Sequence, residues 1–287
     1  MITIFTPTYN RRYRIKDLYE SLCRQTCRDF EWLVVDDGST DDTESLFKDF
    51  IAENKIDIRY FKQPNGGKHR AINHGVREAR GDLFFIVDSD DYLTPNAVEW
   101  MSAEWDKIKY DESFAGVSGR CITSDGKRIG GDGDWQVMDC SPSELRLAHN
   151  VKGDMSEAWR TETLKRFPFP DIDGERFCPE DLVWNRISAA GLKVRFFNIG
   201  NKCVEYLPDG LTASMTKIRM YSPVASMMTY AELMRLDIPV AQKIKAAINY
   251  WRFSFCAKKR SVEIALWAYP FAPLGWLMHI NDKKIIK

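Results

Sequence analysis

The chain has 287 residues, of which 44% are hydrophobic and 29% are charged, as is typical of a globular protein with one large or two small domains. Its 41 basic and 41 acidic side chains cancel, so it lacks the basic excess of most nucleic-acid-binding proteins, and we expect no nucleic-acid partner. The charge is unevenly spread. Residues 1–209 carry 29 basic and 37 acidic side chains, whereas residues 210–287 carry 12 and 4. This asymmetry predicts an anionic partner or surface for the C-terminal part.

The seven cysteines and the N-terminus indicate a reducing compartment. The cysteine spacings fit neither a disulfide scaffold nor a zinc site, so we expect free thiols. The first ten residues lack the basic region and the long apolar run of a signal peptide. We therefore expect a cytoplasmic protein.

The first 120 residues alternate between strand and helix patterns. Each of four short apolar segments is followed by a segment of helical periodicity, and one helix is predicted over residues 68–80 behind a Gly66-Gly67 turn. The alternation predicts an α/β fold with a mostly parallel sheet flanked by helices, and with ligands at the carboxyl ends of the strands. The predicted strands are 2–6, 31–35, 56–61 and 83–87.

The rest of the chain is less regular. Residues 124–127 predict a hairpin turn, residues 180–190 a helix and residues 193–199 a strand. From about residue 222 onward the pattern is helical, with aromatic residues between basic ones.

Polar segments follow the predicted strands, at residues 6–10, 36–39, 66–69 and 88–91. Together they would place five carboxylates beside one crevice, where like charges require a compensating cation. Mg²⁺ and Mn²⁺ prefer carboxylate oxygens and leave part of their coordination shell to phosphates. The Asp88-Ser89-Asp90 motif therefore predicts a divalent metal that holds a diphosphate.

Three motifs, in their order and spacing, resemble the nucleotide-binding half of family 2 glycosyltransferases with the GT-A fold. They are Thr-Pro-Thr-Tyr-Asn at 6–10, Val-Val-Asp-Asp-Gly-Ser-Thr-Asp at 34–41 and Val-Asp-Ser-Asp-Asp at 87–91. The resemblance is strong over residues 1–120 and looser to about residue 210. It implies a metal-dependent enzyme that transfers a sugar, with inversion, from a nucleotide sugar, most often a UDP-sugar.

The resemblance also implies roles for individual residues. One carboxylate of the Asp36-Asp37 pair would accept a hydrogen bond from the uracil imide, and Lys68 would face the phosphates or the sugar. Asp90 would bind the metal, with Asp88 on the metal or the ribose. The implied donor-binding residues are Thr6, Pro7, Thr8, Tyr9, Asn10, Asp36, Asp37, Lys68, Asp88, Ser89 and Asp91.

The second half of such an enzyme supplies the acceptor site and the catalytic base. Glu180 and Asp181 match the acidic motif of the family, and either could remove the proton of the acceptor hydroxyl, with a slight preference for Asp181. Asp154 is a candidate for acceptor binding. We accordingly divide the chain into a nucleotide-sugar-binding half (1–120), an acceptor and base half (121–221) and a helical extension (222–287).

Two other functions stay open. A nucleotidyltransferase would want a glycine-rich loop after the first strand, which residues 7–11 lack, and a catalytically inactive nucleotide-sugar sensor would not need the intact acidic motifs. The Gln-x-x-Arg-Trp motif and the membrane helices of processive family members are not found, so we expect one addition per binding event to a saccharide or lipid-linked acceptor in surface polysaccharide assembly.

The basic and aromatic tail also allows two interpretations. Residues 261–280 are mostly apolar, but Pro270, Pro273 and Gly275 argue against a straight membrane span. We expect peripheral attachment of residues 240–287 to the anionic inner face of the cell membrane. The alternative is a helix packed on the body or on a partner subunit.

Overall fold

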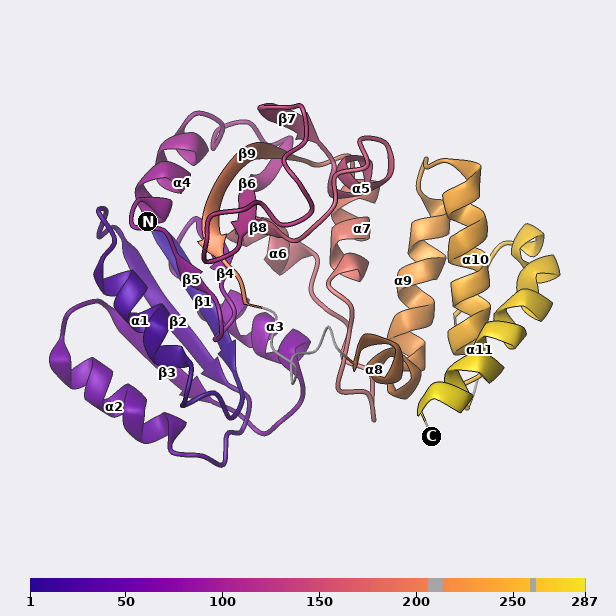
Figure 1. Cartoon of the computed structure of the whole chain (residues 1–287), viewed down its shortest axis with the longest axis horizontal. Helices are drawn as coiled ribbons and strands as arrows, with labels where there is room; N and C mark the ends of the chain where they lie inside the picture. Colours follow the sequence, from indigo (N-terminus) through magenta and orange to yellow (C-terminus); the bar gives the residue numbers. More distant parts are fainter. Residues whose placement is uncertain (206–213, 259–261, 287) are drawn as a thin grey trace. The chain divides into compact units, whose positions relative to one another are not determined.

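The computed structural model describes residues 1–205, 214–258 and 262–286, which form two compact units (Figure 1). We call the first the sheet unit; it comprises Met1–Ser141, Val151–Pro168 and Leu192–Glu205. We call the second the helical unit; it comprises Pro142–Asn150, Phe169–Gly191 and Tyr206–Lys287.

The sheet unit is built on a nine-stranded, mostly parallel sheet in the order β3-β2-β1-β4-β8-β6-β9-β5, with β7 also paired to β9. Strands β1 to β4 run parallel, β8 is antiparallel to β4 and β6, and β6 and β9 are parallel. The strands are β1 (Ile2–Thr8), β2 (Phe30–Asp36), β3 (Ile58–Lys62), β4 (Leu83–Ile86), β5 (Tyr92–Leu93), β6 (Phe114–Ile122), β7 (Val137–Cys140), β8 (Met155–Arg160) and β9 (Lys193–Cys203).

Helices cover both faces of this sheet. The helices α1 (Ile15–Cys23), α2 (Thr43–Glu53) and α4 (Ala97–Asp106) contribute to one core with Ile4 and Trp32. On the opposite face, α3 (Lys68–Glu78) packs so closely that a Cβ on Gly75 would lie 2.2 Å from the ring of Phe5. Helix α6 (Thr161–Arg166) packs beside α3. This two-sided covering explains why β4 is apolar at every position.

The helical unit has its own core, in which α9, α10 and α11 pack side by side (Figure 1). Glu175 accepts hydrogen bonds from the main-chain nitrogens of Val224 and Ala225 and so caps the first turn of α9. None of the described helices is long and apolar enough to cross a membrane. The helices are α5 (Pro142–Leu147), α7 (Asp181–Ala189), α8 (Met215–Tyr221), α9 (Pro223–Arg235), α10 (Val240–Ser254), the 3-10 helix η2 (Leu266–Phe271) and α11 (Ala272–Ile286).

The fold class predicted from the sequence is confirmed: the sheet is mostly parallel, helices flank it, and the C-terminal part is helical. The turn predicted at 124–127 joins the bridged residues Ile122 and Arg128, and none of the seven cysteines, all of which lie in the described part of the chain, forms a disulfide. The main difference lies in β9, which continues four residues beyond the predicted end and so carries Lys202 into the sheet. The proposed boundaries at 120 and 221 stay a prediction.

Candidate active site

The candidate site lies at the carboxyl ends of β1, β2 and β4 in the sheet unit. Asp36 ends β2 opposite Thr8, the last residue of β1, and Asp37 continues this alignment by donating its main-chain N–H to the carbonyl of Thr8 at 2.8 Å. Asp88 follows β4, the other neighbour of β1. Parallel strands that end at one edge therefore bring together motifs that are separate in the sequence, as expected for an open α/β sheet.

The carboxylates of the Asp36-Asp37 pair are buried and bonded to the protein. Asp36 accepts hydrogen bonds from the main-chain nitrogen of Ser39 at 2.7 Å and from the hydroxyl of Tyr60. Burial, followed by this contact with Asp36, raises the pKa of Tyr60, so its hydroxyl stays a donor. A carboxylate has about four acceptor positions, and these two hydrogen bonds occupy two of them.

Asp37 organises the turn that precedes α3. Its Oδ1 accepts from Gln63 Nε2 at 2.8 Å and from the main-chain nitrogen of Gly66 at 2.9 Å, and its Oδ2 accepts from the nitrogen of Gly67 at 2.7 Å. Gly67 has a φ of 100°, which side-chain-bearing residues rarely adopt. Asp37 thus fixes the loop from which Lys68 starts α3.

Lys68 forms an ion pair with the first aspartate of the Asp88-Ser89-Asp90 motif. Its Nζ lies 2.7 Å from Asp88 Oδ1 and 2.8 Å from Asp88 Oδ2. Burial alone would raise the pKa of Asp88, but the cations of Lys68 and Lys202 outweigh it and hold that pKa below its usual value. The two lysines therefore keep Asp88 ionised.

The next two aspartates are less well compensated. Burial and then the charge of Asp88 raise the pKa of Asp90. For Asp91, burial is the largest cause, Lys202 opposes it, and Asp88 and Asp90 add to it, which raises the pKa to about 7. The three carboxylates thus leave an excess of negative charge at this end of the sheet.

Lys202 is the residue of this site that the sequence analysis missed. It lies on β9, its Nζ is 3.7 Å from Asp91 Oδ2, and its side chain is only 11% exposed. Burial would lower the pKa of Lys202, but Cys121, Asp91 and Asp88 together raise it above its usual value. A lysine three residues beyond a predicted strand gives no signal by itself, because its acidic neighbours come from elsewhere in the sequence.

Residues 6–10 divide into buried and exposed positions. The hydroxyl of Thr6 is buried and accepts a hydrogen bond from Trp32 Nε1 at 3.0 Å, so a contact of Thr6 with a donor would use its main chain. Thr8 Oγ1 is buried and has no hydrogen-bond partner within the described part of the chain, while Tyr9 is 47% exposed. Asn10, at a φ of 53°, accepts from the main-chain nitrogen of Thr40 at 2.8 Å and holds the loop after β2.

The carboxylates could supply only part of the coordination shell of a divalent cation. Among the described residues, no group of three or more His, Cys, Asp or Glu side chains is arranged to hold a metal. Asp88 and Asp90 nevertheless offer hard oxygen ligands. Burial first, and then the charge of Asp88, raise the pKa of Asp90, and a cation would relieve the second of these effects. One or two carboxylates are the usual protein contribution where Mg²⁺ is also bound by phosphates. The residues therefore suit a metal shared with a diphosphate.

The candidate base and acceptor residues lie elsewhere in the chain. In the helical unit, Glu180 precedes α7 and Asp181 begins it, and Arg219 Nη2 lies 3.8 Å from Asp181 Oδ2. Asp154 belongs to the sheet unit, where it is exposed just before β8 and its carbonyl accepts a hydrogen bond from the main-chain nitrogen of Cys121.

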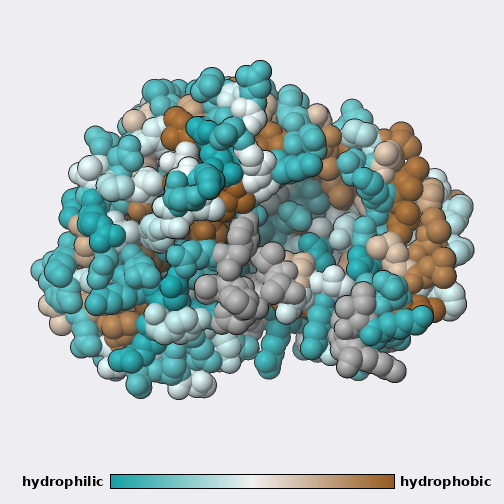
Figure 2. Space-filling model, viewed as in Figure 1, coloured by the Kyte–Doolittle hydropathy of each residue, from teal (hydrophilic) through white to brown (hydrophobic). Residues whose placement is uncertain are grey.

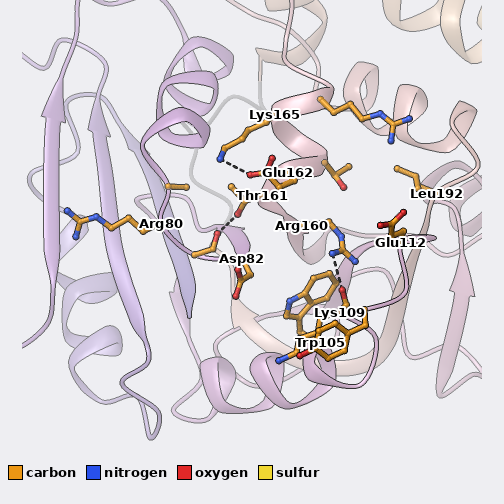
Figure 3. Close-up of a pocket in the computed structure, with 15 residues that line it drawn as sticks. Arg80, Asp82, Trp105, Lys109, Glu112, Arg160, Thr161, Glu162, Lys165 and Leu192 are labelled. Atoms are coloured by element: carbon orange, nitrogen blue, oxygen red, sulfur yellow. Dashed lines mark hydrogen bonds and ion pairs between the residues drawn. The ribbon is translucent and has the colours of Figure 1, made fainter.

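A separate cavity of about 660 Å³ lies at the amino end of β4 (Figure 3). Asp82, which precedes β4, and Arg160, which ends β8, line it together with Trp105. The guanidinium of Arg160 stacks over Trp105 and donates to the carbonyls of Lys109, Asp111 and Phe114. Arg160 therefore connects the segments that line the cavity. The cavity lies at the amino end of β4, whereas Asp88 follows the carboxyl end of that strand.

Residues 3–137 match the family described as Glycosyl transferase family 2. This match contains all three motifs of the carboxyl edge. The matched region belongs to that family.

Curated relatives of this family 2 region share about a third of its residues. The chondroitin synthase of Escherichia coli is 33% identical over 162 residues, which cover 55% of this chain and 23% of that protein. The GalNAc(5)-diNAcBac-PP-undecaprenol beta-1,3-glucosyltransferase of Campylobacter jejuni is 32% identical over 178 residues, which cover 58% and 54%. The alignments thus span about half or less of the length of these relatives.

Solved structures show that the fold extends over nearly the whole chain. S. aureus TarS 1-349 in complex with UDP is 18% identical, with a TM-score of 0.65 over 94% of this chain and 77% of that one. A mannosyltransferase from Pyrobaculum calidifontis in complex with GDP-Man and Mn²⁺ is 19% identical, with a TM-score of 0.56 over 97% and 80%. The chain therefore has the GT-A fold.

Proposed function

We propose that the chain is a glycosyltransferase that moves a sugar from a nucleotide sugar, of the UDP type, to a saccharide or lipid-linked acceptor. The main support for this proposal is that Asp36, Asp37, Lys68 and Asp88 lie together at one edge of a GT-A sheet. TarS, a solved structure with this fold, was crystallised with UDP, and the C. jejuni relative is named for a lipid-linked acceptor. The first protein supports a UDP-type donor, and the second supports this class of acceptor.

In this proposal, the base and the ribose bind between residues 6–10 and the Asp36-Asp37 pair. One carboxylate of the Asp36-Asp37 pair accepts a hydrogen bond from the uracil imide, and the exposed ring of Tyr9 covers the base. Thr8 Oγ1, which is buried and unbonded among the described residues, offers a hydroxyl to the same ligand. A charge-assisted bond from the imide to a carboxylate is about twice as strong as a neutral one, which favours uracil.

The diphosphate lies beside Asp88, Asp90 and Lys68. Asp88 and Asp90 would hold Mn²⁺ or Mg²⁺, which supplies Lewis-acid stabilisation of the departing diphosphate. Lys68, at the start of α3, turns from Asp88 toward the phosphates when the donor binds, because a dianionic ligand competes for its ammonium group. Lys202 and Lys68 keep Asp88 ionised and therefore able to bind a cation.

Inversion requires a single displacement with a base on the acceptor side. Glu180 or Asp181 takes the proton of the acceptor hydroxyl while the bond to the anomeric carbon forms, and Asp154 contributes to acceptor binding. Transfer of one sugar per binding event would suit the assembly of a surface polysaccharide from defined steps.

The proposal is tested by a thermal-unfolding panel of UDP, GDP and their sugars, with and without Mn²⁺. A ligand that binds the folded state raises the unfolding midpoint, so we expect UDP-sugars to raise it and Mn²⁺ to enlarge the effect. Release of UDP in the presence of saccharide acceptors then measures turnover, and chain-length analysis of the product measures processivity.

The outcomes separate the alternatives. Binding of UDP-sugars without any UDP release would favour an inactive nucleotide-sugar sensor. Release of pyrophosphate in place of UDP would favour a nucleotidyltransferase. Long homopolymer made by this chain alone would contradict single addition.

A further inference from the structure

We propose that η2 and the first half of α11 form a surface that binds an anionic lipid bilayer from one side. Seven large hydrophobic side chains are exposed within this short stretch, whereas nine others are scattered over the rest of the described chain. We call these seven the apolar face; they are Leu266 84%, Trp267 42%, Tyr269 51%, Leu274 48%, Trp276 49%, Leu277 57% and Met278 37% exposed.

The apolar face has a fixed backbone because the opposite side of η2 and α11 packs against α10. Ala268 is fully buried, and its carbonyl accepts a hydrogen bond from Trp251 Nε1 at 2.8 Å. A Cβ on Gly275 would lie 2.4 Å from the Cβ of Trp251, so α11 lies directly against α10 there. The exposed side chains are therefore those left over after the helical core has formed, and Figure 2 shows the hydrophobic surface gathered over α10 and α11.

The composition of this face suits a membrane interface. It combines Trp and Tyr, whose rings are apolar and whose N–H and O–H groups stay hydrated, with Leu and Met. No Asp, Glu, Lys or Arg lies between 264 and 281, so no such charge in that segment opposes burial at the acyl boundary. Since no described helix is long and apolar enough to cross a bilayer, the face would lie on the membrane.

The net positive charge of the segment that carries the apolar face favours an anionic surface. The described parts of 240–286 carry six basic and two acidic side chains, and one of the two acids, Asp282, is buried in an ion pair with Arg252 at 2.7 Å. The remaining charges are those of five lysines and of one acidic residue, Glu263. Lys283 and Lys284 are exposed near the end of α11. The remaining basic residues of the predicted tail, Lys259, Arg260 and Lys287, lie outside the described residues.

The same charges disfavour a second copy of the chain as the occupant. A two-fold dimer brings the same patch of both copies together, so the lysines of one copy would approach those of the other. A lipid surface that carries phosphate groups has the complementary charge. This inference does not depend on the transfer reaction.

Flotation of the full chain with vesicles tests the inference. We expect binding to vesicles of phosphatidylcholine mixed with phosphatidylglycerol, weaker binding to pure phosphatidylcholine, and weakening by salt. Changing Leu266, Trp276 and Leu277 together to Ser should lower the partition coefficient on the mixed vesicles by more than about tenfold. Changing Tyr221 and Val240 together to Ser alters exposed apolar residues of the same unit outside the face and should leave binding unchanged.

Two results would overturn the inference. One is equal vesicle binding by the triple variant and the unchanged chain, when both have the same unfolding midpoint. The other is a dimer, detected by light scattering after size exclusion, that becomes a monomer in the triple variant while neither protein binds vesicles. A triple variant with a lowered midpoint is replaced by the single change Leu266→Ser at the most exposed position, for which the same loss of binding is expected and unchanged binding would also reject the face.

Discussion

The Nζ of Lys202 lies 3.7 Å from Oδ2 of Asp91, and both side chains are buried at the end of the sheet. Asp91 follows β4, whereas Lys202 comes from β9, so the pair joins the nucleotide-binding motifs to a strand outside residues 3–137. The contact gives the acidic end of the site a second cation besides Lys68.

Changing Lys202 to Met should weaken both the fold and the binding of UDP. Without the ammonium group, the pKa of Asp91 rises further and its carboxyl takes up a proton, so the cost is that of a lost charge-assisted contact, about 1–3 kcal/mol of unfolding free energy. Urea unfolding measures this loss, and calorimetric titration of UDP measures the affinity, for which we expect a decrease of about tenfold. Lys193→Met on the exposed start of β9 is the matched control. Equal stability and affinity in both variants would show that Lys202 plays no part.

Changing Asp90 to Ala should abolish metal-dependent turnover and leave the fold intact. Asp90 is partly buried beside like charges, so its removal relieves repulsion and the unfolding midpoint should stay level or rise. The assay is UDP release across a Mn²⁺ titration, with circular dichroism as the check on folding. Activity equal to that of the unchanged chain would reject Asp90 as a metal ligand.

The catalytic base can be identified by comparing Asp181→Asn with Glu180→Gln. Removal of the base should lower the rate constant for transfer by at least about a hundredfold. The affinity for UDP should stay the same, because neither residue belongs to the donor site that we propose. We expect the large effect for Asp181. A large effect for Glu180 alone would exchange the two roles, and small effects for both would place the base elsewhere.

Changing Gly75 to Ala should destabilise the sheet unit. The added methyl group would lie 2.2 Å from the ring of Phe5 in a packed interface, and overpacking of this kind costs about 1–3 kcal/mol. Arg77→Ala, on the exposed side of the same helix, should change the unfolding free energy by less than about 0.5 kcal/mol. Denaturant titration compares them, and equal stability would mean that α3 can move away from β1 without cost.

Glu175 should make the stability of the helical unit depend on pH. Burial raises its pKa above the ordinary 4.5, against the opposing effect of the main-chain nitrogens of Ala225 and Val224. The folded state therefore holds the proton more tightly than the unfolded chain. The resulting stabilisation is complete below pH 4.5 and is lost as the pH rises through the raised pKa.

Two substitutions check this pH dependence. Glu175→Gln should remove the pH dependence of the unfolding free energy. Relative to the unchanged chain, this variant should therefore become more stable as the pH rises. Glu175→Ala loses both acceptors of the α9 cap and should cost about 1–3 kcal/mol at every pH. Urea unfolding between pH 4 and pH 7 measures both. A parallel pH dependence in the Gln variant would assign the effect to another group.

Local patterns were sufficient to predict the first four strands of the sheet and most of the acidic cluster. The continuous apolar run at 83–87 indicated a strand covered on both faces, and α1, α2, α4 and α3 do cover the two faces. The rule that parallel strands end at one edge then predicted that Asp36, Asp37 and Asp88 would converge. These steps need only short-range order, because periodicity and turn residues are written within a few positions of each other.

Long-range pairing could only be decided by the tertiary structure. Lys202 looks like an ordinary residue after a strand, and its role appears only because β9 continues beside β6 and β5 toward Asp91. Likewise, the composition of 261–280 predicted an apolar segment but not which side chains would be left exposed once Ala268 and Gly275 had packed on α10. The sequence thus determines which residues carry charge or an apolar side chain. Folding decides which of these residues contact one another and which stay exposed to solvent or ligand. The reason is that contacts between distant segments depend on the geometry of the whole sheet and of the helical core.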